Sequence, residues 1–416
     1  MFSTRPYLSL ASGALLAAGL AGPVQAQSGA DFYKGKTVTY IVATAPGGGY
    51  DLYGRLIAEY MQRYLPGSTF VVKNMPGAGH LIGANAIYAS RPDGLTIGTF
   101  NTGLIYNQLI KADGVKFDLT KMSWIGKASS EPRVFVIGAQ SPIKTFDDLR
   151  SQKQPVNFAT SGIGSANYVE INALAHVLKL PVKILTGYNG NDDQLAMRRG
   201  EVTGGMGSRS SFEQFIKNGY GRYIAQIGGS EKDVPQLKDL IKDADAQAIV
   251  ALVQSQGDIA RLTAGPPGIP APQLQALQDA YRKALQDPEL QAKAAKLERP
   301  VEPGYGADVL KAIQVALNQK PETIALLKNA LEKKEPAATP ASASAATKGT
   351  IAEYDGRGKV VLKLADGKTL DVAISGSRTE ITVAGQKGDR NSLKVGMTCT
   401  VNAPSSGGEA KAIACN

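Results

Sequence analysis

The residues best placed to do chemistry lie in one glycine-rich stretch at 45–55, with the sequence APGGGYDLYGR. A β-branched run comes before the three glycines, and a helical pattern starts at Asp51, a favourable N-cap residue. Glycine lets backbone N–H groups approach a ligand closely, and a helix N-terminus carries partial positive charge. We therefore predict an anion cradle formed by Gly47, Gly48, Gly49, Tyr50 and Asp51. A tight turn that binds nothing is the alternative.

Four further segments rich in Gly, Ser, Thr and Asn follow or adjoin expected strands, at 101–103, 159–167, 186–192 and 204–211. In open α/β sheets the ligand binds outside the carboxyl ends of the strands, where all these segments are expected. Together they predict one polar cleft lined by backbone amides and hydroxyl groups. Its further candidate ligand-binding residues are Asn101, Thr102, Thr160, Ser161, Gly164, Ser165, Tyr188, Asn189, Gly190, Ser208 and Arg209.

Arg209 has two interpretations that the sequence leaves open. It can form a two-pronged contact with a carboxylate, or it can pack at the surface or between lobes. The two histidines differ in context, because His176 lies inside an expected helix whereas His80 follows a glycine-rich turn that could approach the cleft.

Motifs for catalysis are incomplete. Two histidines, with no thiol outside residues 399–415, leave little for a Ser/His triad or a zinc site. No Gly-x-Ser-x-Gly elbow occurs, and the phosphate-loop and dinucleotide fingerprints both fail at required glycines. We therefore expect no enzyme activity, no catalytic residue, no cofactor and no metal.

Alternating strands and helices must position these loops between residues 31 and 330. β-Branched apolar runs predict strands at 37–44, 70–75, 95–100, 134–139, 156–161, 182–187 and 222–228. Apolar stripes with helical spacing predict helices at 52–65, 168–180, 193–199, 271–286 and 310–317. This alternation is typical of doubly wound α/β lobes.

The two ends of the chain differ in composition from residues 31–330. Residues 1–26 predict a cleaved signal peptide, with Arg5, an apolar run at 8–20 and small residues Val24 and Ala26. The run is too short to span a bilayer. Residues 334–348 predict a linker, and 349–416 predict a small all-β module. Cys399 and Cys415 are expected to form a disulfide there in an oxidising compartment.

Net charge limits the classes of partner. The formal charge is +10, yet the basic residues are scattered along the 416-residue chain. Scattered charge together with expected secretion argues against nucleic acid and favours a mild attraction for anionic solutes.

An ordered series of motifs over residues 31–330 resembles the substrate-binding component of tripartite tricarboxylate transporters, the Bug receptor family. The motifs are YKGKTVTYIV, PGGGYD, VVKNMPGAGHLIGANAIY, RPDGLTIGT, ATSGIGS, GYNGNDDQLAMRRGEV and PPGIP. The resemblance implies a type II-like periplasmic-binding-protein fold, with lobe 1 from 31–128 and 229–330 and lobe 2 from 129–228. It also implies a periplasmic monomer that binds a di- or tricarboxylate, an aromatic acid or an acidic amino acid. The membrane subunits of a transporter would be its partners.

Some features depart from that family. Position 50 is often Ser or Thr there and is Tyr here, and His80 replaces a commonly small residue. The β module lies outside the usual family core. Two other functions therefore stay open, namely a sensory or interaction protein that uses the β module, and a hydrolase on the same scaffold.

Overall fold

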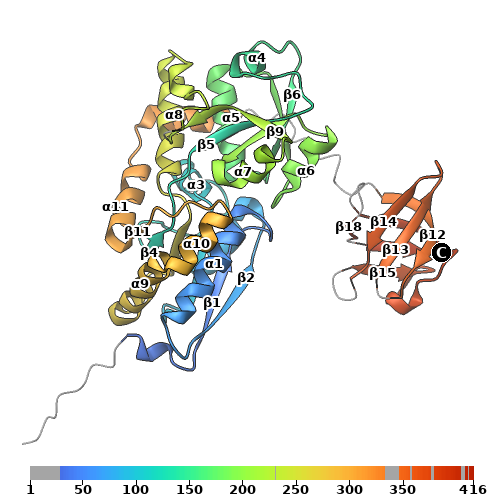
Figure 1. Ribbon diagram of the computed structural model, residues 1–416, viewed down its shortest axis with the longest axis horizontal. Helices are drawn as coiled ribbons and strands as arrows, with labels where there is room; N and C mark the ends of the chain where they lie inside the picture. Colours follow the sequence, from blue (N-terminus) through green and yellow to red (C-terminus); the bar gives the residue numbers. More distant parts are fainter. Residues whose placement is uncertain are drawn as a thin grey trace, which may run out of the picture.

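The computed structural model describes residues 29–229, 231–332, 346–356, 358–375, 379–403, 408–410 and 412–416. The predicted signal peptide and most of the predicted linker lie outside these residues. The described chain forms three sheets of six, five and eight strands (Figure 1). Two of them build α/β lobes, and the third is the C-terminal β module, so the predicted fold class is confirmed. No described helix has the length and apolar character needed to cross a membrane.

The first lobe is built on the six-stranded sheet, in the order β11-β4-β10-β3-β1-β2. In β1, Val38, Tyr40 and Val42 point to the face covered by α1 and α9, whereas Ile41 points to the face covered by α2 and α3. Burial of both faces explains the nearly continuous apolar run. The elements are β1 (Thr37–Val42), β2 (Thr69–Asn74), β3 (Thr96–Phe100), β4 (Ser123–Lys127), β10 (Leu262–Gly265), β11 (Gly304–Tyr305), α1 (Gly49–Arg63), α2 (Leu81–Tyr88), α3 (Gly103–Ile110), α9 (Ala271–Gln286), α10 (Pro288–Lys296) and α11 (Gly306–Leu317).

The second lobe is built on the five-stranded sheet, in the order β7-β6-β8-β5-β9. In β5, Phe135 packs into the cluster beneath α5 and α8, and Val134 packs against the cluster of α6 and α7. The elements are β5 (Arg133–Gly138), β6 (Val156–Thr160), β7 (Val182–Thr186), β8 (Gly204–Ser208), β9 (Gly221–Ile227), α4 (Phe146–Arg150), α5 (Ala166–Leu178), α6 (Asp192–Arg199), α7 (Arg209–Lys217), α8 (Ala244–Gly257) and α12 (Pro321–Glu332).

Two helices correct the predicted lobe boundaries. Residues 229–330 were expected to belong to lobe 1, but α8 and α12 pack on α5 of the second lobe. Ile249 and Val253 of α8 and Leu327 of α12 share one buried cluster with Phe158 of β6. These helices pack on α5, so the chain stays in the second lobe from β9 through α8, crosses to the first lobe at β10 and returns to the second lobe once, with α12.

The β module is a sheet of eight strands, in the order β16-β15-β19-β17-β12-β13-β14-β18. Alternating burial along β14 and β17 sends every second side chain inward, as the alternating sequence predicts. Its elements are β12 (Ala346–Tyr354), β13 (Lys359–Leu364), β14 (Thr369–Ala373), β15 (Glu380–Val383), β16 (Gln386–Lys387), β17 (Thr398–Asn402), β18 (Gly408–Glu409) and β19 (Ala412–Cys415). Since β12 pairs with β17 from Ala346 onward, residues 346–348 are strand rather than linker.

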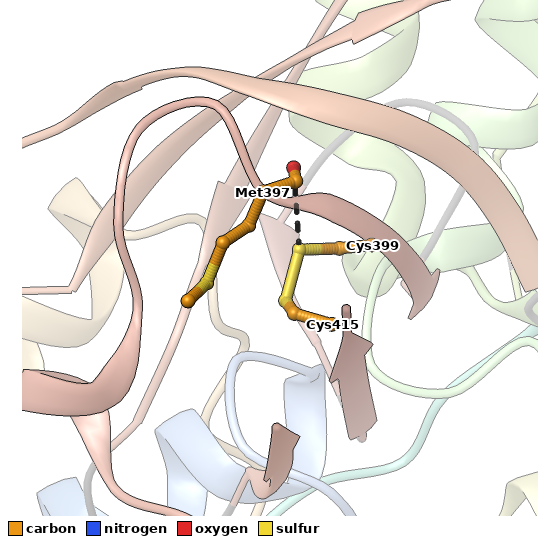
Figure 2. Close-up of a disulfide and its surroundings, with 3 residues drawn as sticks. All are labelled: Met397, Cys399 and Cys415. Carbon is orange, nitrogen blue, oxygen red and sulfur yellow. Dashed lines mark hydrogen bonds between the residues drawn. A yellow bond between two sulfur atoms is a disulfide. The ribbon is translucent and has the colours of Figure 1, made fainter. Parts of the chain in front are cut away.

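The predicted disulfide is present in this module. Cys399 on β17 and Cys415 on β19 are directly opposite each other in an antiparallel pair, and both are buried. Figure 2 shows the bridge, with the carbonyl of Met397 facing the sulfur of Cys399. The bond joins the last strand of the chain to a central one.

Candidate functional site

A cavity of about 100 Å³ lies between the two α/β lobes, where loops at the carboxyl ends of several strands meet. Eight of the predicted ligand-binding residues line it, and His80 does so as well. The eight are Gly48, Gly49, Tyr50 and Asn101 from the first lobe, and Ser161, Asn189, Gly190 and Ser208 from the second. The five predicted segments thus converge on one cleft.

The N-terminus of α1 forms one wall of this cavity. Gly48 is the extended N-cap residue, and its carbonyl accepts the first intrahelical bond from the N–H of Leu52. The N–H groups of Gly49 and Tyr50 therefore have no intrahelical acceptor. A side chain on Gly49 would place its Cβ 2.7 Å from Ser211 Oγ, so any larger residue here would have to displace that hydroxyl.

Asp51 has a different place from the one predicted. The helix begins before it, and its buried carboxylate does not line the cavity. It accepts hydrogen bonds from the N–H of Gly47 at 3.0 Å, from Arg55 Nε at 3.0 Å and from Asn74 Nδ2 at 2.8 Å. Although burial alone raises the pKa of Asp51, these hydrogen bonds bring it below its ordinary value. Asp51 therefore fixes the shape of the glycine loop.

The loop before α5 forms the facing wall. Ser161 lines the cavity beside Asn167, whose Oδ1 accepts from the N–H of Ser161 at 3.3 Å. Ser165 is fully buried, and its hydroxyl lies 2.6 Å from the carbonyl of Gly162 and 2.7 Å from Asn167 Oδ1. Ser165 thus stabilises its own loop, and its hydroxyl is turned away from the cavity.

Four other predicted residues also lie behind the lining. Thr160 is fully buried and donates to the carbonyl of Leu185, and Tyr188 packs in the cluster of Val134 and Phe212. Thr102 is buried at the start of α3, and the carbonyl of Gly164 accepts from Asn107 Nδ2. These residues support the walls because their polar groups or rings already have partners in the protein.

Arg209 is not placed at the cavity, which corrects its prediction as a carboxylate fork. Its guanidinium contacts Asp233 at 3.1 Å and Glu213 at 3.5 Å, and lies over the ring of Tyr223. It borders a separate cavity of about 710 Å³, which Glu131 and residues 298–302 also line. Two carboxylates of the protein therefore pair with the guanidinium group that the prediction assigned to a ligand.

Arg133 is the cation that sequence reasoning missed. It begins β5, is 6% exposed and lines the cavity. Its Nε lies 3.0 Å from an oxygen of buried Glu170 on α5, and its Nη1 donates to Ser208 Oγ at 3.0 Å. The only sequence signal is an arginine at the head of an apolar strand. Its acid partner stands 37 residues later, so spacing alone could not reveal the pair.

His80 faces the cavity with a defined hydrogen-bonding state. Its ring is 7% exposed, and Nδ1 lies 3.0 Å from the carbonyl oxygen of Ala43. Burial lowers the pKa of His80 to about 4, so the ring is neutral at physiological pH. Because a carbonyl only accepts, the proton is on Nδ1, and Nε2 is a hydrogen-bond acceptor.

Asp193 is a second group that the sequence analysis did not assign, since it resembled an ordinary helix start. It lies in the first turn of α6 and lines the cavity. Oδ1 accepts from the N–H of Gln194 at 2.8 Å, and within the described residues the side chain has no ion pair. Burial raises the pKa of Asp193 to about 7, and the neighbouring Asp192 carboxylate adds to the rise.

A buried network behind the cavity joins the lobes. Glu131, in the segment between β4 and β5, accepts from Arg261 Nη2 at 3.1 Å and from Ser210 Oγ of α7 at 2.7 Å. Arg261 in turn lies 4.4 Å from the ring centre of Tyr50 and 4.8 Å from that of Tyr53. The ring of Tyr50 is thereby held by Arg261 at the back of the site.

The lobes are in contact at the front as well. Asn191 Nδ2 of the second lobe donates to the carbonyl of Gly47 at 3.1 Å, and Asn107 Nδ2 of the first donates to that of Gly164 at 2.8 Å. A Cβ on Gly48 would lie 3.3 Å from the Cα of Gly190. These contacts describe an arrangement in which the two lobes touch at the edge of the cavity.

Comparisons with known proteins agree with this architecture. Residues 54–328 match the model of a family described as tripartite tricarboxylate transporter family receptor. A UPF0065 protein in the gbd 5′ region of Cupriavidus necator is 25% identical over 315 residues, or 73% of this chain and 89% of the relative. The periplasmic binding protein BugD has a similar structure, with a TM-score of 0.59 and 20% identity over 72% of this chain and 98% of BugD. MatC from Rhodopseudomonas palustris, solved with bound malate, gives 0.56 and 20% over 71% and 99%.

Proposed function

Because the chain belongs to the tripartite tricarboxylate transporter receptor family, we propose that it captures a small carboxylate in the periplasm and delivers it to the membrane subunits of a transporter. The observation that carries this proposal is the polar interlobe cavity, on which helix N-termini from both lobes converge. The malate bound in the structurally similar MatC supports the carboxylate class.

Three helix starts supply the donors. They are the first turn of α1 with Gly49 and Tyr50, the loop before α5 with Ser161, and the loop before α7 with Ser208. Each helix N-terminus favours an anion through its dipole, and at the start of α1 the N–H groups of Gly49 and Tyr50 also have no acceptor among the described residues. Ser208 Oγ accepts from Arg133, so its own proton is available to a ligand oxygen. Several such donors together can replace the hydration of a carboxylate.

Binding follows from closure of the lobes. An open arrangement admits the anion, and closure brings Gly190 against Gly48 and covers it. Since Arg133 is already paired with Glu170, the site binds mainly through hydrogen bonds and a shared cation. Affinity near the micromolar range, roughly 8 kcal/mol, suits capture followed by release to a transporter.

A thermal-shift screen of the mature chain tests this function. The panel should contain dicarboxylates, tricarboxylates, aromatic acids and amino acids, each beside its primary amide as a neutral control. At a concentration 100 times Kd, a bound acid stabilises the folded chain by about 2.7 kcal/mol, and its Tm rises. A panel in which neutral amides raise Tm while no acid does would refute the carboxylate assignment.

A further inference from the structure

The interlobe cavity contains acceptors that a bare polycarboxylate would not use. Among its titratable lining groups, Arg133 is a cation, Asp193 is a carboxyl group and His80 is a neutral imidazole. The Nε2 of His80 has no partner among the described residues, and the ring is more than nine-tenths buried. A purely anionic ligand would place its oxygens near two acceptors, which is unfavourable.

Asp193 and His80 approach the cavity from opposite lobes. Asp193 is on α6 of the second lobe, and His80 is held on the first lobe by its bond to the carbonyl of Ala43. Both residues line the same cavity, so one bound molecule can contact both walls. Oδ1 of Asp193 already accepts one backbone N–H, whereas Oδ2 has no hydrogen bond among the described residues.

We propose that the cargo is a carboxylic acid that also carries a protonated amine, and that Asp193 and His80 Nε2 accept hydrogen bonds from its ammonium group. This inference rests on the proposed function. The carboxylate lies on the donor side, at the start of α1 and near Arg133, and the ammonium lies on the acceptor side. One cation and one anion in the lining complement the two charges of such a zwitterion.

The ionised and the protonated form of Asp193 would bind different ligands, and the two cases predict opposite changes of affinity with pH. If Asp193 accepts from an ammonium, binding favours its ionised form, and affinity falls as pH drops below 7. If Asp193 is instead protonated and donates to a second ligand carboxylate, affinity rises as pH drops. The charged group that acts on it is Asp192 on the same helix. Arg133 of β5, paired with Glu170 of α5, lines the same cavity, and β8 carries no charged residue. His80 stays neutral over this range because its pKa is about 4.

Matched ligands separate the amine from the carboxylate. Isothermal titration of the mature chain should compare L-aspartate with succinate, L-glutamate with glutarate, and L-phenylalanine with 3-phenylpropionate, with malate as a hydroxyl control. We expect at least one amino acid to bind about tenfold or more tighter than its amine-free partner, as a charge-assisted hydrogen bond allows. Its affinity should fall about tenfold from pH 8 to pH 6 as Asp193 takes up a proton.

Variants assign the effect to the acceptors. Asp193→Asn should abolish both the preference for the amine and the pH slope. Asp192→Asn, an exposed neighbour outside the lining, should keep the preference for the amine and only move the pH slope to lower pH, because the Asp192 carboxylate helps to raise the pKa of Asp193. His80→Asn removes Nε2 at a position with φ 79°, where Asn is tolerated, and should weaken the amino acid more than its partner. A Tm within a few degrees of wild type confirms folding.

Each remaining outcome counts against the inference. If the amine-free acids or malate bind as tightly as the amino acids, or if Asp193→Asn keeps the preference, Asp193 does not select an amine, although carboxylate capture stands. If none of these ligands binds while another acid of the thermal-shift panel does, the inference fails and carboxylate capture stands. If no acid of either panel binds, the proposed function fails as well.

Discussion

The buried pair of Arg133 and Glu170 is the clearest single contact that shapes the site. Glu170 is fully buried and also accepts from the hydroxyl of Tyr106 at 3.2 Å, so it links α5 to β5 and α3. Breaking such a pair leaves an uncompensated buried charge, which costs more than the pair itself contributes.

We predict that Arg133→Met lowers the free energy of unfolding by about 3 kcal/mol, measured by urea denaturation, because Glu170 loses its partner. The double variant Arg133→Met with Glu170→Met should recover most of that loss, since no lone charge remains. Equal destabilisation by the single and double variants would show that the charge balance is not the cause.

The contact of Gly48 with Gly190 is a second contact between single residues, and it affects closure of the lobes. A methyl group on Gly48 would meet the Cα of Gly190 at 3.3 Å only when the lobes are together. Gly48→Ala should therefore weaken ligand binding severalfold in calorimetry while leaving Tm of the unliganded chain nearly unchanged. Gly162→Ala is the matched control, since its Cβ has 4.0 Å of space. A Gly48→Ala protein with wild-type affinity would contradict the closed geometry.

At the scale of elements, the sequence identified buried strands and long amphipathic helices well. The alternation of β1 between two covered faces and the stripe of α1 follow directly from residue pattern. The prediction of elements failed where tertiary packing overrides the local propensity of a segment. Residues 204–208 resembled a glycine loop but form β8 in the middle of a sheet. Their glycines reflect close packing between strands, since a Cβ on Gly204 would lie 2.4 Å from the carbonyl oxygen of Val136.

The start of α1 shows the same limit on the site itself. Glycines at 48 and 49 suggested a loop with Asp51 as cap, yet the helix begins at Gly49, where a Cβ would crowd the side chains of Ser211 and Arg261. The segments that form the cleft were predictable because they follow strands. Arg133 was not predictable, since its partner Glu170 is brought near only by folding. The burial of Asp193 and the contact of Arg209 with Asp233 likewise exist only in the folded chain, although the contact of Arg209 with Glu213 is local to α7.

The disulfide gives a prediction for the β module as an element. In the chain-entropy model, a loop of the size closed by Cys399 and Cys415 contributes about 3 kcal/mol. Reduction, or Cys399→Ser with Cys415→Ser, should lower the unfolding temperature of this module in calorimetry. Ligand affinity should not change, because the lining residues lie on the two lobes. A parallel loss of affinity would show that the module supports the site.

At the scale of the whole molecule, charged contacts behind the cavity hold the lobes in register. Glu131 joins Arg261 and Tyr53 of the first lobe to Ser210 of α7. Arg299 contacts the carbonyl of Ser210, and Glu298 accepts from Gln214 of the same helix. Helix α7 is thus attached to the first lobe, while the front contacts include the hydrogen bonds of Asn191 to Gly47 and of Asn107 to Gly164. We infer that opening separates the front edges about this rear network.

The most direct test of the central claim is isothermal titration of the mature chain with the acids that raise Tm, each paired with its primary amide. Our account predicts one site per chain for a carboxylate, with Kd in the micromolar range, and at least tenfold weaker binding of the uncharged amide. Equal binding of acid and amide would contradict an anion site at these helix N-termini, and so would the absence of any binding acid.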